Sequence, residues 1–377
     1  MAALSGIKVV ELAGIGPGPF AGMMLADAGA EIIRVDRIGT GAMPHLVVGR
    51  GRLGGIEVDL KHPEGTETVL RLIESADVLI EGFRPGVTER LGLGPDVCLA
   101  RNPRLVYARM TGWGQEGPLA PRAGHDINYI SISGVLHSFA RAGERPVPPL
   151  NLVGDYGGGA MFCAFGILAG IIEAQRSGRG QVVDAAMTDG SAVLSAFIHG
   201  MRGIGGWADE PGTNLLDTGA PFYDVYVTAD DKFLAVGCIE PQFYAQFLAG
   251  LGLDGEDLPG QMDRPAWPVL KARFTEVLRS RTRDEWTAVF QDTDACVTPV
   301  LNWDEAAAHP HNAARGTYAA TDGGVQPEAA PRFSRTPSKA DGAPGTLTPD
   351  LLAGWGLDPA HVTKLRETGV LGGIADD

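Results

Sequence analysis

The hydrophobic and polar positions near the N-terminus alternate between short β-rich runs and a helical pattern. Residues 7–12 form a β-rich run, a Gly/Pro turn follows at 14–19, an apolar helix is expected over 20–28, and 31–35 is a second β-rich run. Consecutive parallel strands need a crossover connection, which is usually a helix. This order therefore predicts a βαβ unit and a parallel sheet.

The same alternation continues through the middle of the chain. Strands are expected at 55–60, 76–81, 104–110 and 180–187, the last running into a helix, with helices at 63–75 and, buried, at 156–172. Ligands bind beyond the carboxyl ends of the strands in open parallel sheets. Arg37 and Arg84 each follow a strand, so we expect them where a phosphate could be held. Arg50, Arg52, Lys61 and Arg90 are further candidates, with solvated surface residues as the alternative.

A different pattern begins near residue 223. A hairpin is expected from the runs 225–228 and 233–237, and amphipathic helices at 241–250, 267–280 and 283–291. A chain of 377 residues exceeds the usual size of one core. We expect an α/β fold with a large domain over 1–190, a connector over 191–222, a small domain over 223–320, and a return linker and C-terminal part of the large domain over 321–377. The tail should hold a helix that Asp358 caps, with Pro359 at its first position and Gly369 beyond its end.

The charge balance restricts the classes of partner. The chain has 31 basic and 46 acidic side chains and a net charge of −15. A polyanion would be repelled, which argues against nucleic acid or an anionic membrane as the main partner. Any phosphate must therefore meet a local group of arginines, whose fork-shaped guanidinium suits phosphate oxygens.

The cysteines and the apolar runs indicate a cytoplasmic protein. Cys98, Cys163, Cys238 and Cys296 are scattered and form no Cys-x-x-Cys pair, as is typical of reduced thiols. The longest uncharged run, 156–172, is shorter than the roughly 20 residues of a membrane span. We therefore expect no membrane span.

His125 is the first candidate for chemistry. It stands in Gly124-His125-Asp126-Ile127-Asn128-Tyr129, where an imidazole, a carboxylate, an amide and a phenol lie within five positions. Asp126 and Asn128 could fix its tautomer, and an imidazole titrates near neutral pH. A structural histidine is the alternative reading of this residue.

Asp155 is the second candidate, in Val153-Gly154-Asp155 before an apolar run. An aspartate there commonly caps a helix, and this role is compatible with action as a base. The Gly154 and Asp155 backbone N–H groups could hold a developing enolate oxygen. The helix dipole lowers the carboxyl pKa while burial raises it, and the sequence leaves the outcome open.

Other motifs are weaker or absent. Glu240 lies between a strand and a helix, where a simple helix-start carboxylate is the alternative to a function. Gly14-Ile15-Gly16 with Asp36 begins a dinucleotide fingerprint, but Pro19 replaces its third glycine, which favours a plain tight turn. The sequence has no metal-spaced His/Cys cluster and no Gly-x-Ser-x-Gly elbow, and no lysine stands in a distinctive site. These absences favour an enzyme without metal or cofactor.

Five motifs in order resemble those of the α-methylacyl-CoA racemases, of the family III CoA-transferase superfamily, with the bacterial racemases as the closest type. They are the stretches 124–129 and 153–155 together with 81–87, 181–187 and 239–244. The resemblance runs from about residue 4 to 335. It implies a Rossmann-like large domain, a smaller α/β domain, and an interlocked homodimer whose active sites combine the large domain of one chain with the small domain of the other.

The resemblance also implies roles for individual residues. His125 and Asp155 would be the two bases that move the α-proton of a 2-methylacyl-CoA, and Glu240 of the partner chain would pair with His125. No cofactor is implied, because CoA is part of the substrate. CoA would lie along Arg37, Val58, Asp59, Leu60, Lys61, Gly82, Phe83, Arg84, Arg90, Gly124, Asp126, Ile127, Asn128 and Tyr129.

Two rival functions stay open. In a CoA-transferase, Asp155 would attack a thioester and carry CoA covalently. A CoA-ester binding protein would show no turnover. The acyl group is also open: Met23, Met24, Met187, Met201, Trp207 and Phe222 could line an apolar pocket, with ordinary core packing as the alternative.

Overall fold

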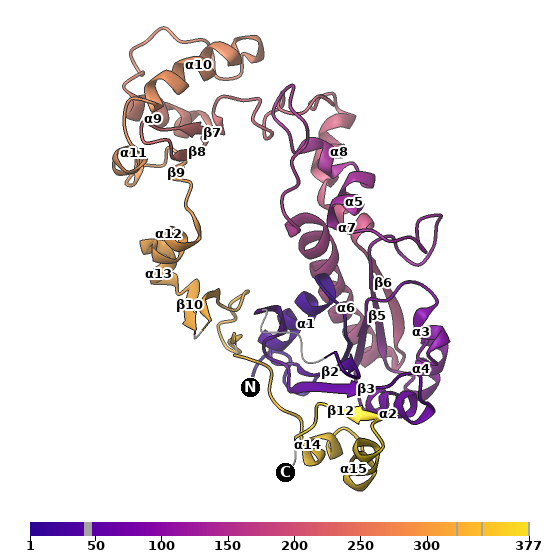
Figure 1. Cartoon of the computed structure of the whole chain (residues 1–377). Coiled ribbons are helices and arrows are strands. Elements are labelled where there is room, and N and C mark those ends of the chain that lie inside the picture. Colours follow the sequence, from indigo (N-terminus) through magenta and orange to yellow (C-terminus); the bar gives the residue numbers. More distant parts are fainter. Residues whose placement is uncertain (41–46, 322, 341, 376–377) are drawn as a thin grey trace. The chain divides into compact units, whose positions relative to one another are not determined.

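The computed structural model describes residues 1–40, 47–321, 323–340 and 342–375, and the chain divides into two compact units (Figure 1). Unit 1 comprises Met1–Ser133, Leu150–Leu194 and Gly316–Asp377, and unit 2 comprises Gly134–Pro149 and Ser195–Arg315. Unit 2 thus includes the expected connector from residue 195 on and an earlier segment that the hydrophobic pattern did not single out. Whether these units coincide with functional domains stays a prediction.

Within the described residues, unit 1 is built on a seven-stranded sheet in the order β12-β3-β2-β1-β4-β5-β6. Strands β1 to β6 are parallel, as predicted, and β12 pairs with β3 antiparallel. The strand order reverses between β1 and β4, which is where doubly wound sheets open a ligand crevice. The strands are β1 (Lys8–Leu12), β2 (Glu31–Arg37), β3 (Gly54–Val58), β4 (Val78–Glu81), β5 (Val106–Thr111), β6 (Gln181–Ala186) and β12 (Leu371–Gly372).

Helices cover both faces of this sheet because side chains alternate between the faces of a strand. Val9 and the other side chains on its face of the sheet pack against α1 (Pro17–Asp27) and α6 (Met161–Ser177). Val10 and the other side chains on the opposite face pack against α2 (Pro63–Glu74) and the C-terminal helices. The helices of unit 1 are α1 (Pro17–Asp27), η1 (Val47–Gly49), α2 (Pro63–Glu74), α3 (Val87–Arg90), α4 (Pro95–Arg101), α5 (Asp126–Ile132), the π-helix η3 (Leu152–Ala160), α6 (Met161–Ser177), α7 (Met187–Leu194), α14 (Pro349–Ala353) and α15 (Pro359–Glu367). A hairpin of β10 (Tyr318–Thr321) and β11 (Gly324–Pro327) also belongs to this unit.

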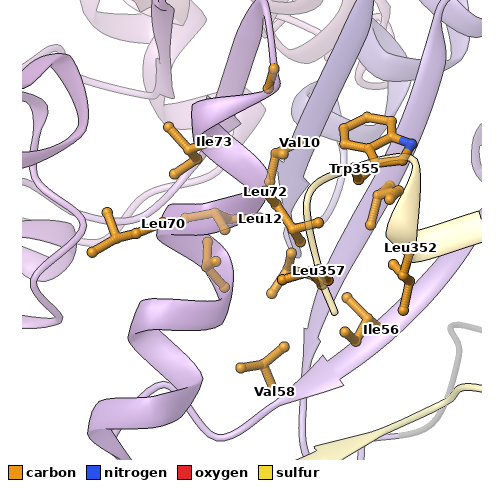
Figure 2. Packing of buried hydrophobic residues seen from close by; sticks show 14 of the residues in the cluster. Val10, Leu12, Ile56, Val58, Leu70, Leu72, Ile73, Leu352, Trp355 and Leu357 are labelled. Carbon is orange, nitrogen blue, oxygen red and sulfur yellow. The ribbon is translucent and has the colours of Figure 1, made fainter. Parts of the chain in front are cut away.

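The C-terminal segment completes the core on one face of the sheet (Figure 2). Leu352, Trp355 and Leu357 are at most 2% exposed and join the cluster that includes Leu12 and Ile56. The predicted tail helix is confirmed, with Asp358 accepting a hydrogen bond from the His361 N–H at 3.2 Å. The tail is therefore an integral part of unit 1.

The apolar run after Asp155 differs from the expected buried helix. One face of α6, including Cys163, Ile167 and Ile171, packs in the core, but Phe165 is 73% exposed and Ile172 50% exposed. The expectation of a buried helix holds for one face only, because the fold covers the side that carries Cys163, Ile167 and Ile171 and leaves Phe165 and Ile172 uncovered. With η3, the segment Leu152–Ser177 is long and apolar enough to cross a membrane. Half of its most apolar window is buried in the fold, as a core helix would be.

Unit 2 contains a three-stranded antiparallel sheet in the order β7-β8-β9, and the predicted hairpin is confirmed. Its core gathers Phe222, Phe247 and Phe274 between sheet and helices. The elements are η2 (Val135–Ser138), α8 (Ala196–Gly203), β7 (Tyr223–Val227), β8 (Phe233–Gly237), α9 (Pro241–Leu251), η4 (Arg264–Ala266), α10 (Trp267–Leu278), α11 (Arg283–Phe290), β9 (Val297–Pro299), α12 (Trp303–Ala308) and α13 (Pro310–Arg315).

Candidate active site

A cavity of about 850 Å³ opens in unit 1 at the carboxyl ends of β1, β2, β4 and β5. This is the position that the reversal of strand order predicts. Its size is within the range of small-molecule sites. Among the expected site residues, the cavity is lined by Arg37, Gly82, Phe83, Arg84, Gly124, His125, Tyr129 and Asp155.

His125 precedes the first turn of α5 on a tightly held loop. Its backbone N–H donates to Asn128 Oδ1 at 3.0 Å, so Asn128 orients the backbone of His125. The Tyr129 hydroxyl donates to the Gly124 carbonyl oxygen, and its ring meets Trp113 edge-on at 4.7 Å between centroids. A side chain at Gly124 would come within 2.8 Å of the Tyr129 ring. These contacts fix the backbone of the loop from which His125 reaches the cavity wall.

Asp155 is not the helix cap that the sequence suggests. It is the fourth residue of the π-helix η3, and Asn151 occupies the N-cap position. Asn151 Nδ2 donates to Asp155 Oδ2 at 3.2 Å, which orients the carboxylate at the cavity wall. π-Helical turns widen the backbone and are frequent at functional sites.

A direct contact joins the two candidate segments. The Asp155 N–H donates to Asp126 Oδ1 at 2.7 Å, and a side chain at Gly154 would lie 2.4 Å from the same oxygen. The expectation that the Asp155 N–H holds an enolate oxygen is therefore wrong, since this donor is already committed. Instead, Asp126 ties the loop of His125 to the helix of Asp155.

The pKa of the Asp155 carboxyl is raised above its ordinary value. Burial is the main cause, and the charge of Asp126 adds to it. The hydrogen bond from Asn151 and the charge of His125 act in the opposite direction but are weaker. Burial therefore outweighs the two effects that lower the pKa of this carboxyl.

Several arginines give the cavity a local positive charge within an acidic protein. Arg37 and Arg84 line it as expected, and Arg122, which the sequence reasoning missed, joins them. Arg50 and Arg52 do not. They are at most 4% exposed and pair with Asp27 at 2.5 Å and Glu11 at 2.7 Å, because each carboxylate neutralises a guanidinium inside the fold.

The remaining residues that were expected along CoA lie outside the cavity lining. Val58 is fully buried in the core, and the backbone N–H of Asp59 donates to the Val370 carbonyl oxygen at 3.0 Å. The full set outside the lining is Val58, Asp59, Leu60, Lys61, Arg90, Asp126, Ile127 and Asn128. Contacts of these residues with CoA stay a prediction.

Sequence reasoning undervalued the turn after β1. Gly14, Ile15, Gly16, Pro17 and Gly18 line the cavity, together with Arg34, Asp36, Thr40 and Trp113. Gly16 has a φ of +70°, and a Cβ there would lie 3.1 Å from Asp155 Oδ2. The strand-end rule applied to residues 7–12 predicts a site at this turn, and Pro19 excludes only the dinucleotide fingerprint there. Met187 lines the cavity, as one of the candidates for an apolar pocket, whereas Phe222 belongs to the core of unit 2.

Glu240 belongs to unit 2. It is the N-cap residue of α9, but its side chain makes no capping hydrogen bond and is exposed. The reading of Glu240 as a capping carboxylate is therefore not supported. Its pairing with His125 stays a prediction.

No group of three or more His, Cys, Asp or Glu side chains in the described part of the chain is arranged to hold a metal ion. Catalysis without a metal or cofactor stays a prediction. The chemistry available at the cavity wall is that of one imidazole, the two carboxyl groups of Asp36 and Asp155, each of raised pKa, and several guanidinium groups.

Comparison with known proteins identifies the family of the chain. The family model for CoA-transferase family III matches residues 4–350. The chain is 48% identical to the mouse (Mus musculus) protein named alpha-methylacyl-CoA racemase, with 96% of each chain covered, and 44% identical to the human protein of that name, with 98% of this chain and 97% of the human one covered. The fold matches the crystal structure of a CAIB/BAIF family protein from Brucella suis with a TM-score of 0.78 at 24% identity, over 98% of this chain and 99% of that one. The chain therefore belongs to CoA-transferase family III.

Proposed function

We propose that the protein is an α-methylacyl-CoA racemase, which interconverts the R and S epimers of 2-methylacyl-CoA thioesters. The observation that carries this proposal is the presence of His125 and Asp155 on the wall of one cavity at the switch point of the sheet. Relatives that cover nearly the whole chain carry the racemase name. The acyl chain would enter beside Met110 and Met187, which line the same cavity.

Inversion at Cα needs a proton to leave one face of the carbon and another to arrive on the opposite face. Two bases serve this better than one. For one epimer, neutral His125 takes the proton while protonated Asp155 supplies one, and the roles reverse for the other epimer. The raised pKa of Asp155 supports this role, because a carboxyl group near its usual pKa would seldom hold the proton that it must deliver.

The CoA portion would be held by charge at the carboxyl ends of β2 and β4. Arg37 is the last residue of β2 and Arg84 follows β4; both line the cavity, and so does Arg122. Guanidinium forks match phosphate oxygens in geometry. No cofactor is part of this scheme, since the thioester itself acidifies the Cα proton.

We also propose a homodimer of interlocked chains. Met161, Phe165, Leu168 and Ile172 are 37–73% exposed and follow one another at spacings of four, three and four residues, which makes one stripe along α6. A contiguous exposed apolar stripe of this kind is typical of an interaction surface. A second copy of the chain would cover it and would bring its own Glu240 to His125.

The compartment is proposed from the cysteines. All four are free thiols, three of them buried, as expected in the reducing cytoplasm. A role in the metabolism of branched lipids follows from the proposed substrate.

The experiment that tests the function is incubation with each epimer of a 2-methylacyl-CoA in deuterium oxide. Racemisation predicts deuterium at Cα and a mixture of epimers from either starting compound. The rival, a CoA-transferase with Asp155 as nucleophile, predicts a thioester on the enzyme. In that case hydroxylamine would inactivate the protein after exposure to a CoA donor alone. A CoA-ester binding protein would neither exchange the Cα proton nor be inactivated by hydroxylamine.

A further inference from the structure

A buried ion pair lies beneath the loop that carries Gly82, Phe83 and Arg84. Glu81, the last residue of β4, is 2% exposed. Its Oε2 accepts the Phe83 N–H at 2.8 Å, and its Oε1 accepts the Arg109 Nε–H at 3.1 Å. One carboxylate therefore binds both the start of the loop and the neighbouring strand β5.

Arg109 extends this connection to the far end of the loop. Its Nη2 donates to Thr88 Oγ1 at 3.3 Å and to a carboxylate oxygen of Glu89, both on α3. The guanidinium also lies over the Tyr107 ring at 5.4 Å. The pair Glu81–Arg109 thus fixes the chain immediately before and after the segment 84–87, and so limits the positions that the Arg84 backbone can take.

We propose that Glu81 is a positioning residue for binding of the CoA portion: its carboxylate, held by Arg109, sets the backbone of the loop from which Phe83 and Arg84 meet the substrate. This inference rests on the proposed function, because it takes the cavity to be the acyl-CoA site. Glu81 lies outside the lining of that cavity, whereas Gly82, Phe83 and Arg84 are part of it.

A buried donor that loses its hydrogen-bond acceptor is costly. Without the Glu81 carboxylate, the Phe83 N–H and the Arg109 guanidinium would each lose a buried acceptor. Such losses are large enough to move a loop toward another arrangement. Because the loop lies at the end of β4 and His125 and Asp155 lie on other elements, the displacement should weaken substrate binding more than it slows proton transfer. A role confined to stability would lower the melting temperature and leave the KM unchanged.

The test compares Glu81→Ala and Glu81→Gln with the wild type and with Glu67→Ala. Glu67 is the control for loss of a carboxylate–arginine pair away from the cavity: it lies on α2, is 35% exposed and pairs with Arg71 and Arg101. For each protein, KM and kcat are measured with one 2-methylacyl-CoA, and the dissociation constant of CoA itself is measured by calorimetry. Amide hydrogen exchange at Phe83 in the wild type reports the hydrogen bond directly.

We expect Glu81→Ala to raise KM and the CoA dissociation constant about tenfold while kcat changes less than about twofold. Glu81→Gln keeps an oxygen that can accept the Phe83 N–H, so it should fall between Ala and wild type, and Glu67→Ala should match the wild type. The inference is overturned if both Glu81 variants bind CoA as the wild type does, if kcat alone falls, or if the Phe83 amide exchanges as fast as an unprotected one. Failure of the proposed function would look different, since the wild type would then leave the Cα proton in place.

Discussion

The backbone N–H of Asp155 donates to Oδ1 of Asp126 at 2.7 Å, so the residue next to one proposed base holds the other. This contact spans two elements that lie 29 residues apart in sequence. It fixes the relative positions of the π-helix and the loop that carries His125. The negative charge of Asp126 also helps to raise the pKa of Asp155.

Asp126→Ala should therefore lower kcat by about 10- to 100-fold, because a displacement of the base by a fraction of an ångström is costly in rate. Asp126→Asn keeps the acceptor oxygen and should lose less. Racemisation rates of both variants check this, with Asp96→Ala as the control, since Asp96 is exposed on α4 and lies outside the cavity lining. Equal losses in the Ala and Asn variants would contradict a tether through the oxygen.

The close approach of Gly16 to Asp155 gives a second prediction. Gly16→Ala adds a Cβ about 3.1 Å from Asp155 Oδ2, in a backbone conformation with φ of +70° that disfavours alanine. Gly6→Ala is the matched control, since Gly6 has a φ of +85° but open space around the new Cβ. Both variants should lose similar stability, but only Gly16→Ala should lose most of its activity. Comparable activity in the two variants would mean that the turn does not constrain the carboxylate.

Part of this site could be read from the sequence. The β-rich runs 31–35 and 76–81 were recognisable, and the rule for strand ends placed Arg37 and Arg84 at the cavity. The parallel order of the strands followed from the same alternation of strands and helices. Both features depend on residues that are close together in the sequence, so the local pattern of hydrophobic and polar residues predicts them.

Other parts could not be read because they depend on tertiary contacts. An aspartate before an apolar run looks like a cap, and nothing local distinguishes the π-helix in which Asp155 lies. Arg52 resembles a phosphate ligand until the fold buries it beside Glu11. Phe165 looks like a core residue in sequence, since hydrophobicity does not tell whether the fold or a second chain will cover it.

The exposed stripe on α6 gives a third prediction. Phe165→Glu should prevent association of two chains, because a charge would have to be buried in the interface. Val97→Glu is the control: Val97 is 43% exposed and lies on α4, away from the stripe. Light scattering should show a monomer only for Phe165→Glu, with loss of racemisation if Glu240 must come from the partner. A Phe165→Glu protein that remains dimeric and active would contradict the proposed interface.

The buried Glu81 predicts a pH dependence of stability. Burial raises its pKa to about 7, against the opposing effects of the Phe83 N–H and of Arg109; Glu89 on α3 adds a small further rise. A folded-state pKa above the unfolded value of about 4.5 means that ionisation of Glu81 costs folding free energy, although above about pH 7 the ionised form is present and pairs with Arg109. The contribution of Glu81 to the free energy of unfolding is therefore complete at low pH and is lost as the pH rises from about 4.5 to 7.

Glu81→Gln, which has no proton to lose, should gain stability relative to the wild type by up to about 3 kcal/mol as the pH rises across this window. Urea denaturation of both proteins at pH 5 and pH 8 measures the difference. A difference that stays constant between the two pH values would show that Glu81 keeps an ordinary pKa in the fold.

The central claim is that His125 and Asp155 act on opposite faces of one carbon, and stereospecific exchange in the single variants tests it most directly. Each purified epimer of a 2-methylacyl-CoA is incubated in deuterium oxide with His125→Ala or with Asp155→Asn. Racemisation should fall at least about 10²-fold in both. Each variant should still exchange the Cα proton of one epimer. The epimer that His125→Ala exchanges should be the opposite of the one that Asp155→Asn exchanges. Exchange of the same epimer by both variants, or near-normal racemisation in either variant, would contradict the two-base account.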